Sequence, residues 1–336
     1  MDEIIASTVN ENKVYYCARC GAEVQVLKKP VQDPKCPTLL CCGKPMTAKD
    51  AVGVTTEKDM DVKEVIKGRY DACAEQGGGE GAACCAGETA ANPSFAAEHG
   101  LYSQEELSQV PETAFTLSRG CGNPTGFADL QSDEVVVDFG CGAGIDVVLA
   151  AQRAGPSGKV VGVDFAPHMI ERARQTVKDA HVADSTTFVL ADLDKIELPD
   201  DYADVIISNC VINLCPCKVA VYREAFRILK PGGRLAISDI VYSGKVDPQV
   251  LDRFQSTWAG CVGGAIEEDT YFEILHDTGF ADIEVVARHP LASKELEEMA
   301  CCPGPEFTPA PAKEDIASVE GKVVSIKFRA NKPERS

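Results

Sequence analysis

The sequence lacks the marks of several protein classes. No stretch approaches eighteen consecutive apolar residues, so neither a membrane-spanning helix nor a membrane partner is expected. The opening residues, Met-Asp-Glu-Ile-Ile, have neither the basic nor the apolar region of a signal peptide, which favours a cytoplasmic protein. Basic residues are too few for a positive surface, since 33 of them stand against 52 acidic residues, a formal net charge of −19. Nucleic acid is therefore not an expected partner, because its phosphates would be repelled.

Cysteine, by contrast, is abundant, with 16 in 336 residues. Disulfide frameworks are typical of short exported chains, and this chain is long and shows no export signal. Three adjacent pairs, Cys41-Cys42, Cys84-Cys85 and Cys301-Cys302, also argue against simple packing as the general explanation. The cysteines therefore favour the binding of a soft, thiophilic ion.

Length and composition predict two folded units joined by linkers. A hydrophobic fraction of 45% is enough for a sizeable core. Glycine and proline punctuation and the alternation of apolar strands with amphipathic helices mark the divisions. In chain order we expect a small cysteine-rich β unit (residues 1–50), a linker and thiol-bearing segment (51–96), a parallel α/β core (97–290), and a proline-rich insertion with a final strand (291–336).

Within the core, apolar runs predict a seven-stranded sheet. A helix should begin at Pro167, and another should present Val219, Tyr222, Phe226 and Leu229 on one face before residues 230–233 end it. A third helix should end at Gly279, a typical left-handed cap. The expected strands are Glu134–Phe139, Val160–Asp164, Thr186–Leu190, Val205–Ser208, Leu235–Ile240, Ile283–Ala287 and Val323–Phe328.

The first strand runs into a glycine-rich turn, Asp138-Phe-Gly-Cys-Gly-Ala-Gly144. Glycines let such a turn bend and let a ligand approach the backbone at a helix N-terminus. The third glycine comes one residue too early for the dinucleotide pattern, and no Gly-Lys-Ser/Thr follows. The spacing resembles motif I of class I S-adenosylmethionine methyltransferases, with a Rossmann-like α/β fold. That resemblance implies a cofactor site formed by Asp138, Gly140, Gly142, Gly144, Asp164 (ribose) and Asp192 (adenine).

Three further cysteines lie where they can meet above one edge of the sheet. Cys210 ends the fourth strand, Cys121 lies just upstream of the glycine-rich turn, and Cys261 lies between the fifth strand and the last helix. Three thiolates suit a trivalent thiophilic centre. The alternative, small buried hydrophobes, fits Cys141 better than it fits these three together.

The segments around these cysteines resemble arsenite methyltransferases. The resemblance rests on Cys-Gly-Asn-Pro at 121–124, Ile-Ser-Asn-Cys-Val-Ile-Asn-Leu at 207–214 and Cys-Val-Gly-Gly-Ala at 261–265, and it spans roughly residues 70–287. It implies methyl transfer from S-adenosylmethionine to trivalent arsenic, supplied as arsenite or its thiol conjugates, with thioredoxin or glutathione as reductant. The implied arsenic ligands are Cys121, Cys210 and Cys261, with Cys84 or Cys85 in thiol exchange and Asn209 near the cofactor.

The amino-terminal cysteines resemble a second family. Cys17-Ala-Arg-Cys20 followed by Cys41-Cys42 is similar to desulforedoxin, which implies one iron held by four cysteines at this site. Zinc remains an alternative, since C-x-x-C is also half of a zinc ribbon and Cys36 lies in a long interval between the pairs.

Two other functions stay open at this point. One is a class I methyltransferase of a small organic molecule such as a quinone precursor, and the other is a thiol-rich protein that sequesters metalloid without catalysis. The sequence assigns no role to Cys36, Cys215, Cys217, Cys301 or Cys302. It also leaves the number of methyl transfers and the oligomeric state undetermined.

Overall fold

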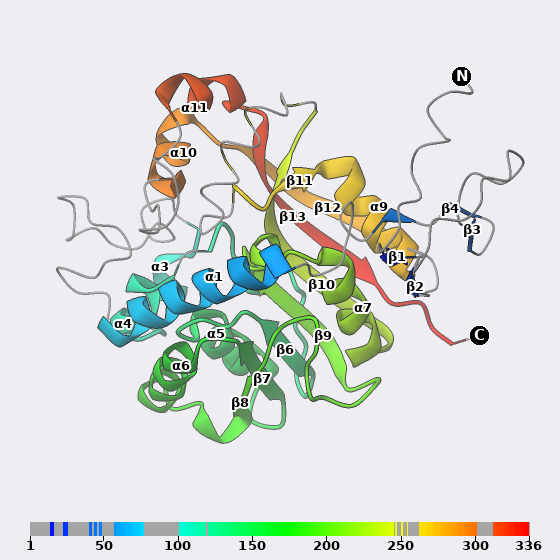
Figure 1. The fold of residues 1–336 in the computed structure, drawn as a ribbon. Coiled ribbons are helices and arrows are strands. Elements are labelled where there is room, and N and C mark those ends of the chain that lie inside the picture. The colour runs from blue at the N-terminus through cyan, green and yellow to red at the C-terminus, as the bar shows by residue number, and fades with distance from the viewer. Residues whose placement is uncertain are drawn as a thin grey trace, which may run out of the picture.

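The computed structural model describes the fold of the core and parts of the amino-terminal region (Figure 1). Described in it are short strands within the first 50 residues, residues 57–76, 101–118, 120–244, 262–300 and 312–335, and positions 246, 250 and 254. Within these ranges no helix is long and apolar enough to cross a membrane.

The amino-terminal residues contain two small sheets, as expected of a β unit. Strands β1 (Val14–Tyr16), β2 (Glu23–Gln25) and β5 (Thr47–Ala48) form an antiparallel sheet in the order β2-β1-β5. Strands β3 (Leu40–Cys41) and β4 (Lys44–Pro45) pair separately.

The core is one large sheet that contains all seven predicted strands. Its order is β12-β13-β10-β9-β6-β7-β8, and a short β11 pairs with β10. Strands β6 to β10 run parallel, whereas β13 pairs antiparallel with both β10 and β12. The bounds are β6 (Val135–Phe139), β7 (Lys159–Asp164), β8 (Thr186–Leu190), β9 (Ala203–Asn209), β10 (Leu229–Tyr242), β11 (Ile266–Glu267), β12 (Ala281–Pro290) and β13 (Val323–Asn331).

Apolar side chains cover both faces of the central strands, which explains their continuous hydrophobic runs. Val137 and Ile206 belong to the core on one face, and Val136 and Ile207 to the core on the other. Successive residues of a strand point to opposite faces, so each strand contributes to both cores. Because strands β6 to β10 run parallel, they end at a common edge of the sheet. The loops after them lie where ligands of such sheets bind.

Helices flank the sheet, and those that the sequence predicts correspond to α5, α6, α7 and α9. Pro167 is the first residue of α6, and Gly279, at φ 114°, caps α9 in the left-handed conformation. The helices and 3₁₀ turns are α3 (Gln104–Ser108), α4 (Glu112–Thr116), η1 (Pro124–Gly126), α5 (Ile145–Ala154), α6 (Pro167–Asp179), η2 (Ala183–Ser185), η3 (Ile212–Leu214), α7 (Lys218–Ile228), α9 (Glu268–Thr278), α10 (Ser293–Ala300) and α11 (Lys313–Val319).

One boundary differs from the prediction. Leu229, expected on the face of α7, adopts an extended conformation and begins β10, where it pairs with Ala203. Pro231 accounts for the difference, because a proline disfavours helical backbone at the residue before it and cannot continue a helix.

A helix also replaces part of the predicted linker. Helix α1 (Glu57–Gln76) packs against α6, with Ile66 and Ala74 buried. Asp71 of α1 accepts a hydrogen bond of 2.7 Å from the backbone N–H of His168, in the first turn of α6. That acceptor supplies the cap that α6 lacks in its own sequence. Such contacts come from residues about 100 positions away, so the local composition does not reveal the helix.

Candidate active site

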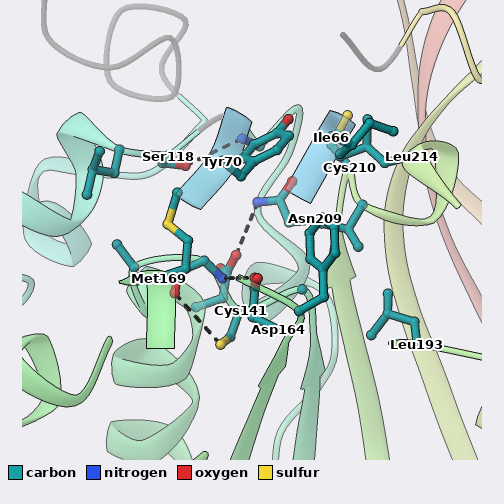
Figure 2. Close-up of a pocket in the computed structure, with 18 of the residues that line it drawn as sticks. Ile66, Tyr70, Ser118, Cys141, Asp164, Met169, Leu193, Asn209, Cys210 and Leu214 are labelled. Carbon is teal, nitrogen blue, oxygen red and sulfur yellow. Dashed lines mark hydrogen bonds between the residues drawn. The ribbon is translucent and has the colours of Figure 1, made fainter. Parts of the chain in front are cut away.

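A cavity that is partly open to solvent lies at the carboxyl ends of the parallel strands. Figure 2 shows side chains from separate segments converging on it. This is the edge at which ligands of open α/β sheets bind. The residues lining it come from the glycine-rich turn, the ends of β7 and β9, the loop after β8, residues 114–120 and helix α1.

The glycine-rich turn is held in place by the acid that ends β7. Asp164 accepts hydrogen bonds from the backbone N–H groups of Gly142 (2.9 Å) and Ala166 (3.0 Å). Gly140 and Gly142 have φ angles of +74° and +50°, which favour glycine. A Cβ added at Gly142 would meet no atom within 4 Å, so this part of the turn leaves room for a ligand close to the backbone.

Several carboxylates surround the turn with little positive charge to balance them. Burial raises the pKa of Asp164 to about 6 and that of Asp146 to about 6. Burial also raises the pKa of Asp138 well above its usual range, and the charges of Asp146 and Asp164 add to that shift. Among the described residues, the Oδ2 atom of Asp138 has no hydrogen-bond partner. This arrangement fits a positively charged ligand, which would lower the cost of keeping these acids ionised.

Helix α1 closes the cavity opposite the turn. Ile66 and Tyr70 line it (Figure 2), and Lys63 lines it as well while binding Asp194 at 2.7 Å. None of these three side chains was singled out from the sequence, where nothing marks α1 as part of the site. Asp192 was predicted to contact adenine, and it lines the same region of the cavity.

Asn209, the last residue of β9, links that strand to the segment that carries Cys121. Its side-chain amide binds the backbone of Gly122 in both directions, donating to the carbonyl oxygen at 2.8 Å and accepting from the N–H at 3.1 Å. It also donates to the hydroxyl of Tyr102 and to Asp146, and Tyr102 in turn donates to Asp146. Asn209 does line the cavity, but these contacts show that it anchors the segment carrying Cys121 to the end of β9.

Two of the three predicted metalloid ligands lie in one buried cluster. Cys121 is 4% exposed and Cys210 is 2% exposed, and both pack in an apolar cluster with Ile240 and Val262. Cys210 also lines the cavity. Cys261 lies outside the described residues, but its neighbour Val262 belongs to this cluster, 1% exposed. A hydrogen bond from Ser325 to the carbonyl oxygen of Cys121 ties the segment to β13.

The backbone of Cys210 has an uncommon conformation. Its φ angle is +60°, in the left-handed region that non-glycine residues rarely adopt, and its N–H donates to the carbonyl oxygen of Ser238 at 2.8 Å. Such a conformation costs free energy and persists only when its surroundings fix it.

The remaining described thiols have distinct environments. Cys217 is buried and caps α7, its sulfur accepting a hydrogen bond from the N–H of Ala220 at 3.3 Å. Cys215 lines the cavity, and burial raises its pKa to about 12. Cys141 packs beneath the glycine-rich turn against the strand at Gly162, consistent with a small buried hydrophobe.

Other predicted residues are not tested by the structure. Cys41 is described only as part of β3. Outside the described residues lie Cys17, Cys20, Cys36, Cys42, Cys84, Cys85, Cys261, Cys301 and Cys302.

Comparison with known proteins agrees with this geometry. Residues 130–279 match the family model of a methyltransferase domain. The chain is 35% identical over 258 residues to an arsenite methyltransferase of Halobacterium salinarum, covering 74% of this chain and 64% of that protein. It is 37% identical over 197 residues to the arsenite methyltransferase of Aquipseudomonas alcaligenes, covering 55% of each. The human arsenite methyltransferase is 31% identical over 207 residues, covering 58% of this chain and 54% of that protein.

A crystal structure of an arsenic(III) S-adenosylmethionine methyltransferase from Chlamydomonas reinhardtii has the same fold, with a TM-score of 0.53 and 24% identity. The alignment covers 72% of this chain and 75% of that one. The chain thus spans 64% of the length of the Halobacterium protein and about half that of the other two relatives. Together, the sheet order, the glycine-rich turn and these matches identify a class I methyltransferase domain with a Rossmann-like α/β fold.

Proposed function

We propose that this chain is an arsenite methyltransferase, which transfers methyl groups from S-adenosylmethionine to thiol-bound trivalent arsenic. The observation that carries the proposal is the position of Cys210. Its side chain lines the cavity beside the glycine-rich turn and shares a buried cluster with Cys121. The names of the homologous proteins support the choice of substrate.

The residues of the turn fit the cofactor. Asp164 would accept hydrogen bonds from the ribose hydroxyls and Asp192 from the adenine amino group, while Gly142 leaves room for close approach to the backbone. The carboxylates of Asp138 and Asp146 would favour a cation nearby. When bound, S-adenosylmethionine supplies an electrophilic methyl group on a positively charged sulfur.

The three cysteine thiols would bind the arsenic substrate. Cys121, Cys210 and Cys261 would replace hydroxide or glutathione on arsenic, and the thiol protons would leave with those ligands as water or free glutathione. The arsenic lone pair would then attack the methyl group, whose bond to the sulfonium sulfur would break to release S-adenosylhomocysteine. Arsenic carries no proton to remove, so no general base is required. The contribution of the chain is then proximity and in-line orientation, an effect that can reach ~7–11 kcal/mol.

The amino-terminal cysteines complete the proposal. Cys17, Cys20, Cys41 and Cys42 would hold one iron or zinc ion, and iron is the choice that the similarity to desulforedoxin favours. Cys84 or Cys85 would exchange thiols with the active site, and thioredoxin or glutathione would reduce them again. Free thiols of this kind persist in the cytoplasm, where the protein would serve in arsenic detoxification.

The direct test is to incubate the full chain with arsenite, S-adenosylmethionine and a thiol reductant and to identify the arsenic species formed. Methylated arsenic together with S-adenosylhomocysteine supports the proposal. Stoichiometric arsenic binding without S-adenosylhomocysteine favours sequestration instead. Methylation of a small organic molecule that persists after Cys210→Ser favours the organic-substrate alternative.

A further inference from the structure

A buried lysine and a buried aspartate lie beneath the segment Cys210–Cys217, which we call the thiol loop. Lys218 is the first residue of α7 and is 6% exposed, and Asp239 in β10 is completely buried. The reaction proposed above uses neither residue. Burial lowers the pKa of Lys218 and raises that of Asp239 to about 6, and the charge of each residue opposes the shift of the other.

Both side chains hold the backbone of the thiol loop. The Nζ atom of Lys218 donates to the carbonyl oxygens of Asn213 and Cys215, each at 3.4 Å. The backbone N–H of Asn213 is one of the neighbours that lower the pKa of Asp239, against the larger effect of burial, which raises it to about 6. Asn213, at the centre of the loop, is therefore bound through its carbonyl oxygen by the lysine, and its backbone N–H lies near the aspartate.

Further hydrogen bonds connect the same part of the loop to its neighbours. The hydroxyl of Tyr271 in α9 donates to Asp239 at 2.8 Å, and the side-chain amide of Asn213 donates to the carbonyl oxygen of Ile240. At the start of the loop, the N–H of Cys210 is bound by β10 through the carbonyl oxygen of Ser238. The loop is thus bound to β10 at Cys210 and at Asn213.

Buried ionisable side chains are seldom the most stable way to fill a core, because apolar side chains of similar volume often do as well or better. Here the two side chains lie beside a loop whose first residue is strained, at φ +60°, and carries a thiol in the cavity. We propose that Lys218 and Asp239 are positioning residues, which hold the thiol of Cys210 in the place where it binds trivalent arsenic. The inference rests on the proposed function, since it concerns the same ligand.

The test compares arsenite and cofactor affinities of Lys218→Met with those of the unaltered chain. Arsenite binding is measured by equilibrium dialysis with arsenic quantification, and S-adenosylmethionine binding by calorimetry. The expected result is arsenite affinity weakened about 10- to 100-fold, the usual effect of losing an outer-shell partner, with cofactor affinity unchanged within about threefold. In turnover, KM for arsenite should rise while KM for S-adenosylmethionine stays constant.

Lys332→Met is the matched control. Lys332 is also a buried lysine that donates to two backbone carbonyl oxygens, of Phe226 and Leu229, and pairs with an aspartate, Asp201. It lies at the opposite end of β10 from the thiol loop, since its N–H binds Gly233. This variant should lose thermal stability as Lys218→Met does, yet keep its arsenite affinity.

Tyr271→Phe provides a milder change, should Lys218→Met fail to fold. It removes one donor to Asp239 but keeps the ring, and arsenite affinity should still fall, by about tenfold. Unchanged arsenite affinity in the folded variants, or equal weakening of cofactor binding, would overturn the positioning role. Failure of the unaltered chain to bind arsenite would instead overturn the proposed function itself.

Discussion

The two sides of the cavity are built on different principles. The nucleotide side consists of the glycine-rich turn and the acids at the ends of β7 and β8, all within residues 138–192. The thiol side brings together Cys121, Cys210 and a contact from Ser325, residues separated by as many as 204 positions. The first side is a local motif, whereas the second exists only once the whole sheet has formed.

Their electrostatics differ as well. The nucleotide side carries several buried carboxylates whose pKa values burial raises, as suits a cationic methyl donor. The thiol side is an apolar cluster that includes Ile240 and Phe254. A neutral metalloid gains its binding energy from bonds to sulfur and needs no compensating charge. In the proposed reaction the cofactor would therefore meet acidic groups, and the arsenic would meet an apolar cluster of which Cys210 lines the cavity.

The largest expected effect is a difference in methylation rates that distinguishes one proposed thiol ligand from the other two. Arsenite can take three thiolates, but singly methylated trivalent arsenic has only two exchangeable positions. If Cys121 is the third ligand, Cys121→Ser should slow arsenite methylation more than about 100-fold, beyond the usual effect of an outer-shell loss, and spare most methylation of methylarsenite. Rates on both substrates check this. Equal losses on the two would remove Cys121 from the role of third ligand.

Gly140 of the glycine-rich turn lies against Val211, the residue after Cys210, so a larger side chain there should affect both sides of the site. A Cβ there would lie 2.3 Å from a methyl carbon of Val211. We expect Gly140→Ala to cost about 3 kcal/mol of unfolding free energy, from left-handed strain together with overpacking. Denaturant unfolding measures this. Cofactor and arsenite binding should both weaken.

Gly142→Ala is the control for that change. It carries the same kind of strain, at φ +50°, but a Cβ at that position meets nothing within 4 Å. It should cost only about 1 kcal/mol and leave arsenite binding intact. Equal losses for the two variants would show that Val211 does not link the two sides.

Asp164 tests the nucleotide side alone. Asp164→Ala removes a buried acceptor, so S-adenosylmethionine binding should weaken by ~1.5–3 kcal/mol, the worth of a hydrogen bond to a charged group. Calorimetry gives the affinity, and arsenite binding by dialysis should not change. An unaltered cofactor affinity would take Asp164 out of the cofactor site.

The smallest expected effect is a pH dependence of the same side. Burial raises the pKa of Asp164 to about 6, so its carboxylate becomes protonated as pH falls from 7 to 5. The protonated group loses its charge and acceptor strength, and S-adenosylmethionine affinity should fall about tenfold over that range. Asp164→Asn should flatten this dependence. A profile equally steep in that variant would assign the titration to another acid.

The contrast between the two sides also explains which features the sequence predicts. The turn from Asp138 to Gly144 is recognisable because its residues are adjacent, and β8 has the predicted bounds. The anchoring of Gly122 by Asn209 could not be predicted, because 87 residues separate the two. Motif resemblance nonetheless picked out Cys121 and Cys210, which the fold does bring into one cluster.

Helix α1 was missed for a related reason. Its sequence is polar, and its stability depends on packing against α6 and on the hydrogen bond between Asp71 and His168. Leu229 was misplaced because its hydrophobic spacing continues that of α7, while Pro231 decides where the helix ends. The hydrophobic periodicity of the sequence reveals neither the packing of α1 against α6 nor the effect of Pro231 on the end of α7.

The most direct measurement of the central claim is the arsenic species formed by the unaltered chain and by Cys210→Ser, each given arsenite, S-adenosylmethionine and a thiol reductant. We expect methylated arsenic from the unaltered chain and none from the variant, with cofactor affinity equal in both. Methylated arsenic formed at the same rate by Cys210→Ser, or none formed by the unaltered chain, would contradict it.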